Sequence, residues 1–363
     1  MPIKQKKPKS LFRQEVIELS AYHVVDASGF IKLDAMENPY SWPQDIVDKW
    51  LKQLRQCQPN RYPDPSASKL KSVIRKCNCI PNSVELLLGN GSDELIQILL
   101  MAIAGKNATV LAPEPTFVMY KQIAQSLGIR FIGVPLLESD FSLDMDAMRK
   151  AIKHYQPAIT FLAYPNNPTG NLFSETDILE ILETAPGIVV LDEAYAPFAG
   201  NTFITKLHLF DHLLVMRTLS KLGLAGLRLG FLTGSRTWVE QLDKLRLPYN
   251  VNILTQVSAE FALSNYSIFE AQTQTICNDR NLLFKQLNAI KDITVFPSHA
   301  NFILFRLDKA NANQVFEALK RFGILVKNMS TAGGVLADCL RVTVGTPDQN
   351  SRFLRAIQKA LQE

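Results

Sequence analysis

The sequence has no apolar run long enough to cross a membrane and no framework of paired cysteines. A membrane-spanning helix needs about 20 predominantly apolar residues, and no stretch of the 363-residue chain reaches that length. The basic segment 1–13 also lacks the apolar core of a secretory signal. An odd, scattered set of five cysteines does not suggest disulfides. We therefore expect a cytoplasmic protein with reduced thiols at Cys57, Cys77, Cys79, Cys277 and Cys339.

Strong net charge and metal-ligand spacing are lacking as well. The chain has 39 basic and 34 acidic residues, a net charge of +5, and this excess is too small and scattered to indicate nucleic-acid binding. His208 and His212 are four residues apart but lack a third ligand nearby, and no second pair follows Cys77 and Cys79. We expect no metal site.

What the sequence does contain is a repeated alternation of apolar strands and amphipathic helices. Continuously apolar strands separated by helices are typical of a mostly parallel sheet that is covered on both faces, an α/β fold. The strands are expected at residues 84–88, 108–112, 129–134, 159–163, 188–191, 212–216 and 229–232.

The pattern changes near residue 250, after Pro248. One long helical stretch is expected over 254–287, followed by short strands and a helix that read as a smaller α+β unit. We therefore predict a large domain over 46–250. The N-terminal arm 1–45 and residues 251–363 form the second, smaller part.

Residues that could bind a ligand or take part in catalysis follow the predicted strands. In open α/β sheets, ligands bind at the carboxyl ends of the strands. The first strand runs into GNGSDE (89–94), a glycine turn at a helix start that favours an anion. The turn lacks the third glycine of a dinucleotide site and the lysine of a nucleotide-triphosphate loop. Later strands deliver Phe117, Asn167, Asp192, Tyr195, Ser220, Lys221 and Arg228.

Each of these residues alone is a weak signal, but together they indicate one ligand. A phosphate, a cationic ring nitrogen and an aldehyde would together require an anion site, a buried carboxylate and a lysine. Pyridoxal 5'-phosphate carries all three groups, and a lysine is its usual covalent partner.

At these positions the sequence resembles the fold-type-I pyridoxal-phosphate aminotransferases and, within them, the histidinol-phosphate aminotransferase family. The resemblance extends from about residue 22 to the C-terminus. It is carried by KLDAMENPY (32–40), NRYPDP (60–65), GNGSDE (89–94), PTF (115–117), YPNNPTG (164–170), LDEAYAPF (191–198), RTLSKLGLAGLRLGF (217–231) and CLRVTVGT (339–346).

The resemblance implies a role for each matching residue. Lys221 would form the Schiff base with the cofactor, Asp192 would pair with the ring nitrogen, and Phe117 would stack on the ring. Tyr195 and Asn167 would bond the ring hydroxyl. The cofactor phosphate would lie among Gly91, Ser92, Asp93, Ser220 and Arg228, with Tyr62 added by the other subunit of a homodimer.

The substrates implied are glutamate and histidinol phosphate. Arg341 would bind their anionic ends, while Tyr22, Asn38 and Asn167 would line the pocket. Met36 departs from the family, which usually has Asn there, so the resemblance does not predict the pocket wall at this position. Three alternatives remain: a threonine-phosphate decarboxylase, a broad aromatic aminotransferase, and a non-catalytic protein on the same fold.

Overall fold

The computed structural model describes residues 11–21, 25–105 and 107–363. Its main sheet has seven strands in the order β2-β8-β7-β6-β5-β3-β4. The strands are β2 (Glu85–Gly89), β3 (Thr109–Glu114), β4 (Arg130–Pro135), β5 (Ile159–Ala163), β6 (Ile188–Asp192), β7 (Leu213–Thr218) and β8 (Gly230–Gly234). β8 alone runs in the direction opposite to the other six strands, so the expected mostly parallel α/β sheet is confirmed.

The sheet is buried on both faces because its strands are apolar without interruption. In β2, Leu86 and Leu88 pack into one apolar cluster and Leu87 packs into the cluster on the other side. One face is covered by α4 (Ser92–Ile103), α5 (Val118–Ser126) and α9 (Arg236–Asp243). The other is covered by α3 (Ser68–Cys77), α6 (Met145–Tyr155), α7 (Glu175–Thr184) and α10 (Ile253–Ser264).

A second, antiparallel sheet has the order β12-β13-β10-β9. Its strands are β9 (Ile293–Val295), β10 (Phe302–Leu307), β12 (Lys327–Asn328) and β13 (Cys339–Thr343). The helices α12 (Ala312–Arg321) and α13 (Pro347–Ala360) pack with it in a third apolar cluster. A short parallel pair, β1 (Ile31–Lys32) with β11 (Ile324–Leu325), ties the N-terminal segment to this part of the chain.

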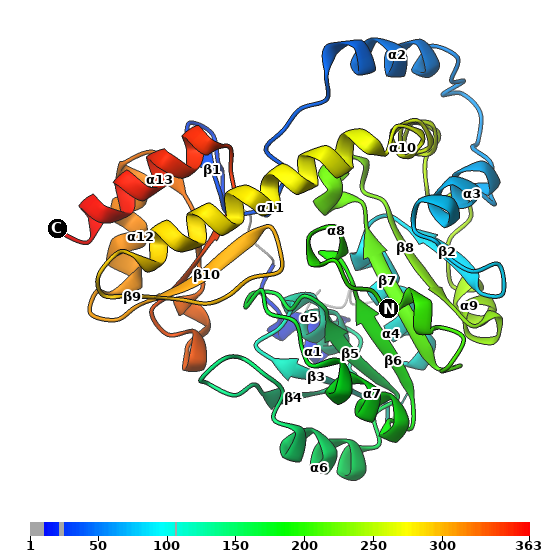
Figure 1. The fold of residues 1–363 in the computed structure, drawn as a ribbon. Coiled ribbons are helices and arrows are strands. Elements are labelled where there is room, and N and C mark those ends of the chain that lie inside the picture. The colour runs from blue at the N-terminus through cyan, green and yellow to red at the C-terminus, as the bar shows by residue number, and fades with distance from the viewer. Residues whose placement is uncertain (1–10, 22–24, 106) are drawn as a thin grey trace, which may run out of the picture.

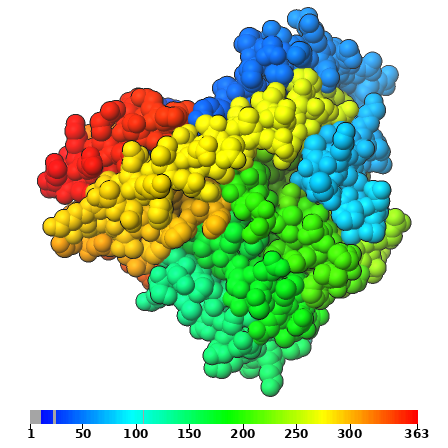
Figure 2. Space-filling view, viewed as in Figure 1, coloured from blue at the N-terminus to red at the C-terminus, as the bar shows by residue number. Residues whose placement is uncertain are grey.

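The expected single helix over 254–287 is wrong in one respect, because the chain breaks between α10 and α11 (Ser267–Asn288). Asn265 leaves the helical conformation, and its Nδ2 donates to the Phe261 carbonyl, a local bond that competes with helix continuation. Helix α11 then passes from the large sheet to the small one (Figure 1). In Figure 2 its yellow surface joins the blue N-terminal helices to the orange and red C-terminal part.

Two points bear on the expected organisation. The boundary near residue 250 stays a prediction, and α10, just beyond it, packs against α3 and against α2 (Gln44–Leu54). Across the described ranges, no helix has both the length and the apolar character that a bilayer crossing requires.

Candidate active site

A cavity lies where the parallel strands β5, β6 and β7 end side by side, and it brings together the central predicted site residues. The cavity receives Asn167 after β5, Asp192 from β6 and Lys221 after β7. The lining residues are Met36, Ser92, Asp93, Phe117, Ala163, Pro165, Asn167, Asp192, Ala194, Tyr195, Thr218, Ser220, Lys221 and Arg228.

Asp192 is a buried carboxylate held by two donors. Its Oδ2 accepts from the Tyr120 hydroxyl at 2.6 Å, and its Oδ1 accepts from the Ala194 amide at 3.1 Å. Burial raises the pKa of Asp192 to about 6, although both hydrogen bonds oppose that rise. Without a cationic partner the charged form is costly, so this carboxylate suits a positively charged ligand atom.

Tyr120 is a site residue that the sequence reasoning missed. It is fully buried on α5 and stacks on Phe161, with ring centroids 4.5 Å apart. A signal was present, because a tyrosine on a buried helix face needs a partner for its hydroxyl. Tyr120 also follows Phe117 by three residues, which places both on one side of the helix, and their rings meet edge to face at 5.6 Å.

Lys221 lies in the tight turn Ser220–Leu224 that follows β7. Its Nζ donates to the Ala35 carbonyl at 3.2 Å. Burial, and after it the positive field of Arg341, lowers the pKa of Lys221 to about 8. A large share of this amine is therefore neutral at mildly alkaline pH, the form that attacks a carbonyl or accepts a proton.

The start of α4 forms a cradle for an anion. Gly91 precedes the helix with φ +80°, and a Cβ there would lie 2.7 Å from Arg228 Nη2. Arg228 bonds Ser220 Oγ through Nη1 at 3.4 Å and pairs with Asp93 through Nη2 at 3.2 Å. Free helix N–H groups, a hydroxyl and a guanidinium together fit a phosphate. The Asp93 side chain instead forms an ion pair with Arg228.

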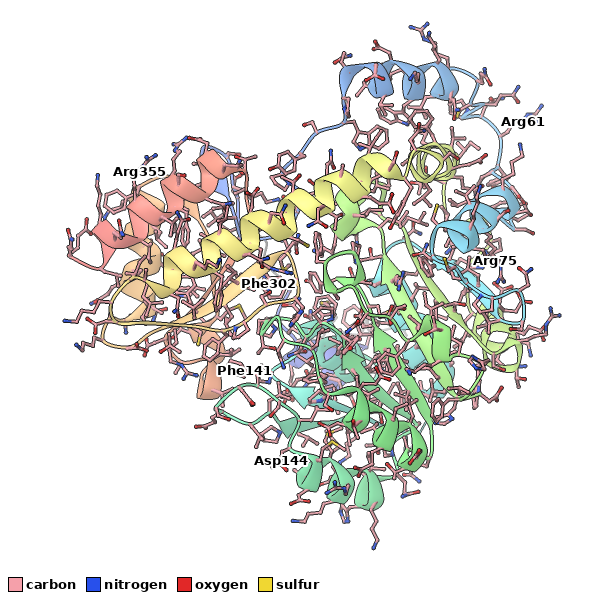
Figure 3. All side chains as sticks on the ribbon, viewed as in Figure 1. Arg61, Arg75, Phe141, Asp144, Phe302 and Arg355 are labelled. Carbon is pink, nitrogen blue, oxygen red and sulfur yellow. The ribbon has the colours of Figure 1, made fainter. Side chains whose placement is uncertain are left out.

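A directional hydrogen-bond chain links the second sheet to the cavity. Arg341, buried on β13, donates through Nη1 to Asn167 Oδ1, and Asn167 Nδ2 donates to the Tyr195 hydroxyl at 3.1 Å. Burial raises the pKa of Tyr195, which keeps its hydroxyl protonated. The Arg341 guanidinium also lies 5.1 Å from the ring centre of Phe302, the β10 residue labelled in Figure 3.

Met36 ends this chain and joins the two sheets. The Tyr195 hydroxyl donates to Met36 Sδ at 3.2 Å. The Met36 backbone is left-handed (φ 56°) and is held from both sides. Its N–H donates to Thr343 Oγ1, and its carbonyl accepts from Asn301 Nδ2, each at 2.9 Å. The side chain at the position that departs from the family is thus part of the cavity wall.

Among the predicted residues that the structure describes, Asn38 and Tyr62 do not line this cavity. Tyr22 is outside the described residues. Asn38 is not among the lining residues; its Nδ2 donates to the Leu222 carbonyl at 3.2 Å and to Gln272 at 2.9 Å, so it supports the turn that carries Lys221. Tyr62 is 80% exposed and stacks on Tyr249, with centroids 4.3 Å apart.

Two further observations complete the geometry. Lys327 on β12 is the cross-strand partner of Arg341, so two cationic side chains start from one face of the small sheet. The strand pairing that makes them neighbours is not visible in the sequence.

Among the described residues, no group of three or more His, Cys, Asp or Glu side chains could hold a metal ion.

Comparison with known proteins gives concordant results. The family model for aminotransferase class I and II matches residues 28–357. A protein of Nitrosococcus oceani named histidinol-phosphate aminotransferase 2 is 55% identical over 95% of this chain and 96% of its own length. One of Ralstonia nicotianae named histidinol-phosphate aminotransferase 1 is 48% identical over 97% and 95%.

Solved structures share the fold. A histidinol-phosphate aminotransferase from Sinorhizobium meliloti, in complex with pyridoxal-5'-phosphate, superposes with a TM-score of 0.86 at 19% identity, covering 97% of this chain and 98% of its own. An L-threonine-O-3-phosphate decarboxylase from Porphyromonas gingivalis gives 0.79 at 23%, covering 91% and 99%. At such identities the likeness concerns the fold alone.

Proposed function

The chain belongs to the class I and II aminotransferases, a family that uses pyridoxal phosphate, and on that premise we propose that it is a histidinol-phosphate aminotransferase of histidine biosynthesis. It would exchange an amino group between L-glutamate and imidazole acetol phosphate, with 2-oxoglutarate and L-histidinol phosphate as products. The observation that carries this proposal is one cavity that contains Lys221 and Asp192 and that Arg341 approaches through Asn167.

The residues present fit the cofactor. We assign its ring nitrogen to Asp192, whose buried carboxylate lacks a cationic partner among its bonds. Its phosphate belongs in the cradle at the start of α4, formed by Gly91, Ser92, Ser220 and Arg228. Phe117 offers a ring face, and Asn167 with Tyr195 offers polar atoms for the ring hydroxyl. When bound, the cofactor supplies an electron sink for amino-group transfer.

Lys221 acts as the covalent anchor and then as the base. Its neutral Nζ accepts a proton from the α-carbon of the amino substrate and returns a proton in the reverse direction. The lowered pKa of Lys221 supports this role, because a protonated amine cannot accept a proton. The same groups serve both half-reactions, so ping-pong kinetics are expected.

Arg341 would bind the anionic end of each substrate. A guanidinium presents a planar fork that matches carboxylate and phosphate alike, which allows one residue to serve glutamate and histidinol phosphate. Lys327, its cross-strand partner, adds a second positive charge for the larger anion. We keep Tyr22 as a pocket residue in the proposal and give Asn38 a positioning role, because it supports the turn that carries Lys221.

A homodimer is part of the proposal. Tyr62 would complete the cofactor phosphate site of the other subunit, and its exposed ring, stacked on Tyr249 near exposed Leu247, supports a contact surface there. We place the enzyme in the cytoplasm, where its five free cysteines would stay reduced.

A half-reaction experiment tests the substrate. The enzyme is converted with glutamate, then mixed separately with imidazole acetol phosphate and with phenylpyruvate, and the return of the cofactor absorption is followed. Faster return with imidazole acetol phosphate supports the proposal, whereas equal rates would indicate a broad aromatic aminotransferase. Release of carbon dioxide from threonine phosphate without transfer from glutamate would overturn it. Lys221→Ala should abolish transfer, and a fully active variant would exclude catalysis at this site.

A further inference from the structure

A half-buried arginine on α11, Arg280, has no carboxylate partner in the part of the chain that the structure describes. Arg280 Nη1 donates to the Ala300 carbonyl at 3.0 Å and, weakly, to the Phe198 carbonyl at 3.5 Å. Its Nε is buried and has no acceptor. Among the described residues, no carboxylate acts on Arg280, and the nearby Cys277 thiol has its pKa raised by burial, which favours its neutral form. A desolvated cation of this kind is stabilised when an anion binds beside it.

The surroundings of Arg280 offer further donors. It lines a pocket of about 230 Å³ together with Asn281, Phe284, Pro297, Ser298 and His299. Ser298 Oγ accepts from the Ala300 amide at 3.1 Å, which leaves the hydroxyl proton available to a ligand. The Asn281 amide and the His299 ring can donate as well, and none of the described residues that line the pocket is a carboxylate.

We propose that this pocket binds a small tetrahedral oxyanion, either inorganic phosphate or the phosphate group of a small ester, with Arg280 as its counter-charge. A guanidinium fork, a hydroxyl, an amide and an imidazole supply donors from several directions, which suits a tetrahedral anion better than a planar carboxylate. The lining residues are distinct from those of the candidate active site, so the inference does not rest on the proposed function.

The pocket is connected to the turn that carries Asn167. The His299 amide donates to the Gly170 carbonyl at 2.7 Å, and a Cβ on Gly170 would lie 2.7 Å from Ser298 Oγ. Arg280 itself reaches Phe198, at the end of the segment that follows Tyr195. An anion held here would therefore join α11, the loop before β10 and two loops of the large sheet.

His299 reports on occupancy because its titration responds to charge in the pocket. Burial lowers the pKa of His299, and the positive field of Arg280 lowers it further. Within the described ranges, Arg280 from α11 is the one charged group that acts on this ring. A bound dianion opposes that field, so the pKa of His299 rises when the site fills.

The test is histidine NMR of the cofactor-loaded enzyme, titrated with pH in chloride and in inorganic phosphate at equal ionic strength. Cofactor loading fills its own phosphate site, and His299→Asn assigns the resonance among the five histidines. We expect phosphate to raise the pKa of His299 by about one unit, with a saturable dependence on concentration. The resonances of His154, His208 and His212 serve as internal controls.

Two variants separate the site from general effects. Arg280→Gln should raise the pKa of His299 in chloride and abolish its response to phosphate, while the exposed Arg236→Gln should leave the response unchanged. If Arg280→Gln does not fold, Arg280→Lys, which keeps the charge without the fork, should weaken the response. Glycerol phosphate in place of phosphate tests the ester source. The proposal would be overturned if the pKa of His299 were the same in phosphate and in glycerol phosphate as it is in chloride.

Discussion

Removing the Tyr120 hydroxyl should destabilise the cofactor-free protein in a pH-dependent way. The pKa of Asp192 is about 6 in the folded protein, against 3.8 ordinarily, a difference of about two units or about 3 kcal/mol. Because the folded pKa is raised, the folded state binds this proton more tightly than the unfolded chain. Stability from this group is therefore full below about pH 4 and falls as pH rises to about 6.

Among the groups that lower the pKa of Asp192, the Tyr120 hydroxyl is the largest. Tyr120→Phe should thus raise that pKa further. At pH 8 the lost bond is to a charged carboxylate, and we expect a loss of about 1.5 to 3 kcal/mol. At pH 5 the carboxyl group is protonated and the loss should be about 1 kcal/mol or less.

The measurement is urea unfolding of the cofactor-free protein at pH 5 and pH 8, for the parent and for Tyr120→Phe. Tyr155→Phe, on α6 across the sheet, is the matched control and should show no growth of its effect with pH. The Tyr120→Phe loss should be larger at pH 8 by about 1 to 2 kcal/mol. Equal losses at the two pH values would refute the reasoning, because the hydroxyl would then not serve the charged form.

Three other predictions concern the cofactor and the substrate. The rate at which cofactor-free enzyme attaches pyridoxal phosphate, followed by absorbance, should rise about tenfold per pH unit up to about pH 8 and then level off, because the amine of Lys221 must be neutral; a midpoint near 10.5 would contradict this. Gly91→Ala should raise the dissociation constant for the cofactor about tenfold or more, since its Cβ displaces Arg228. Cofactor affinity is measured by fluorescence titration of the cofactor-free enzyme. Gly29→Ala, at a similar φ but with open space around it, should leave that affinity unchanged. Arg341→Lys should raise KM for both amino donors about 100-fold in steady-state assays, because the bidentate bond is lost, with an unaltered cofactor spectrum; a change in only one KM would show that the substrates use different cations.

The strand segments and the residues that follow them could be predicted because both follow from local pattern, whereas the order of the strands within the sheet was not predicted. A continuously apolar strand such as β6 must lie inside a covered sheet, and its last residue, Asp192, then lies at the ligand-binding edge. The same reasoning places Lys221 after β7. The side chains that meet from distant segments could not be predicted in this way.

Tyr120 and Met36 illustrate what a local pattern omits. Tyr120 reaches Asp192 across 72 residues of sequence, and nothing near it in the chain indicates that partner. The left-handed backbone of Met36 depends on Asn301 and Thr343, which are more than 260 residues away. The break between α10 and α11 was missed for another reason, because the apolar periodicity continues while one asparagine side chain takes a backbone acceptor.

The reversed strand β8 acts as a spacer for the candidate phosphate site. It lies between β2 and β7, so the two loops that would hold the anion, after Gly89 and after Thr218, start two strand spacings apart, about 9.6 Å. Because β8 runs the other way, it begins at this edge, with Gly230. A Cβ there would lie 2.8 Å from Ser92 N. The space for the phosphate therefore exists because β8, a reversed strand that begins with glycine, separates the parallel strands β2 and β7.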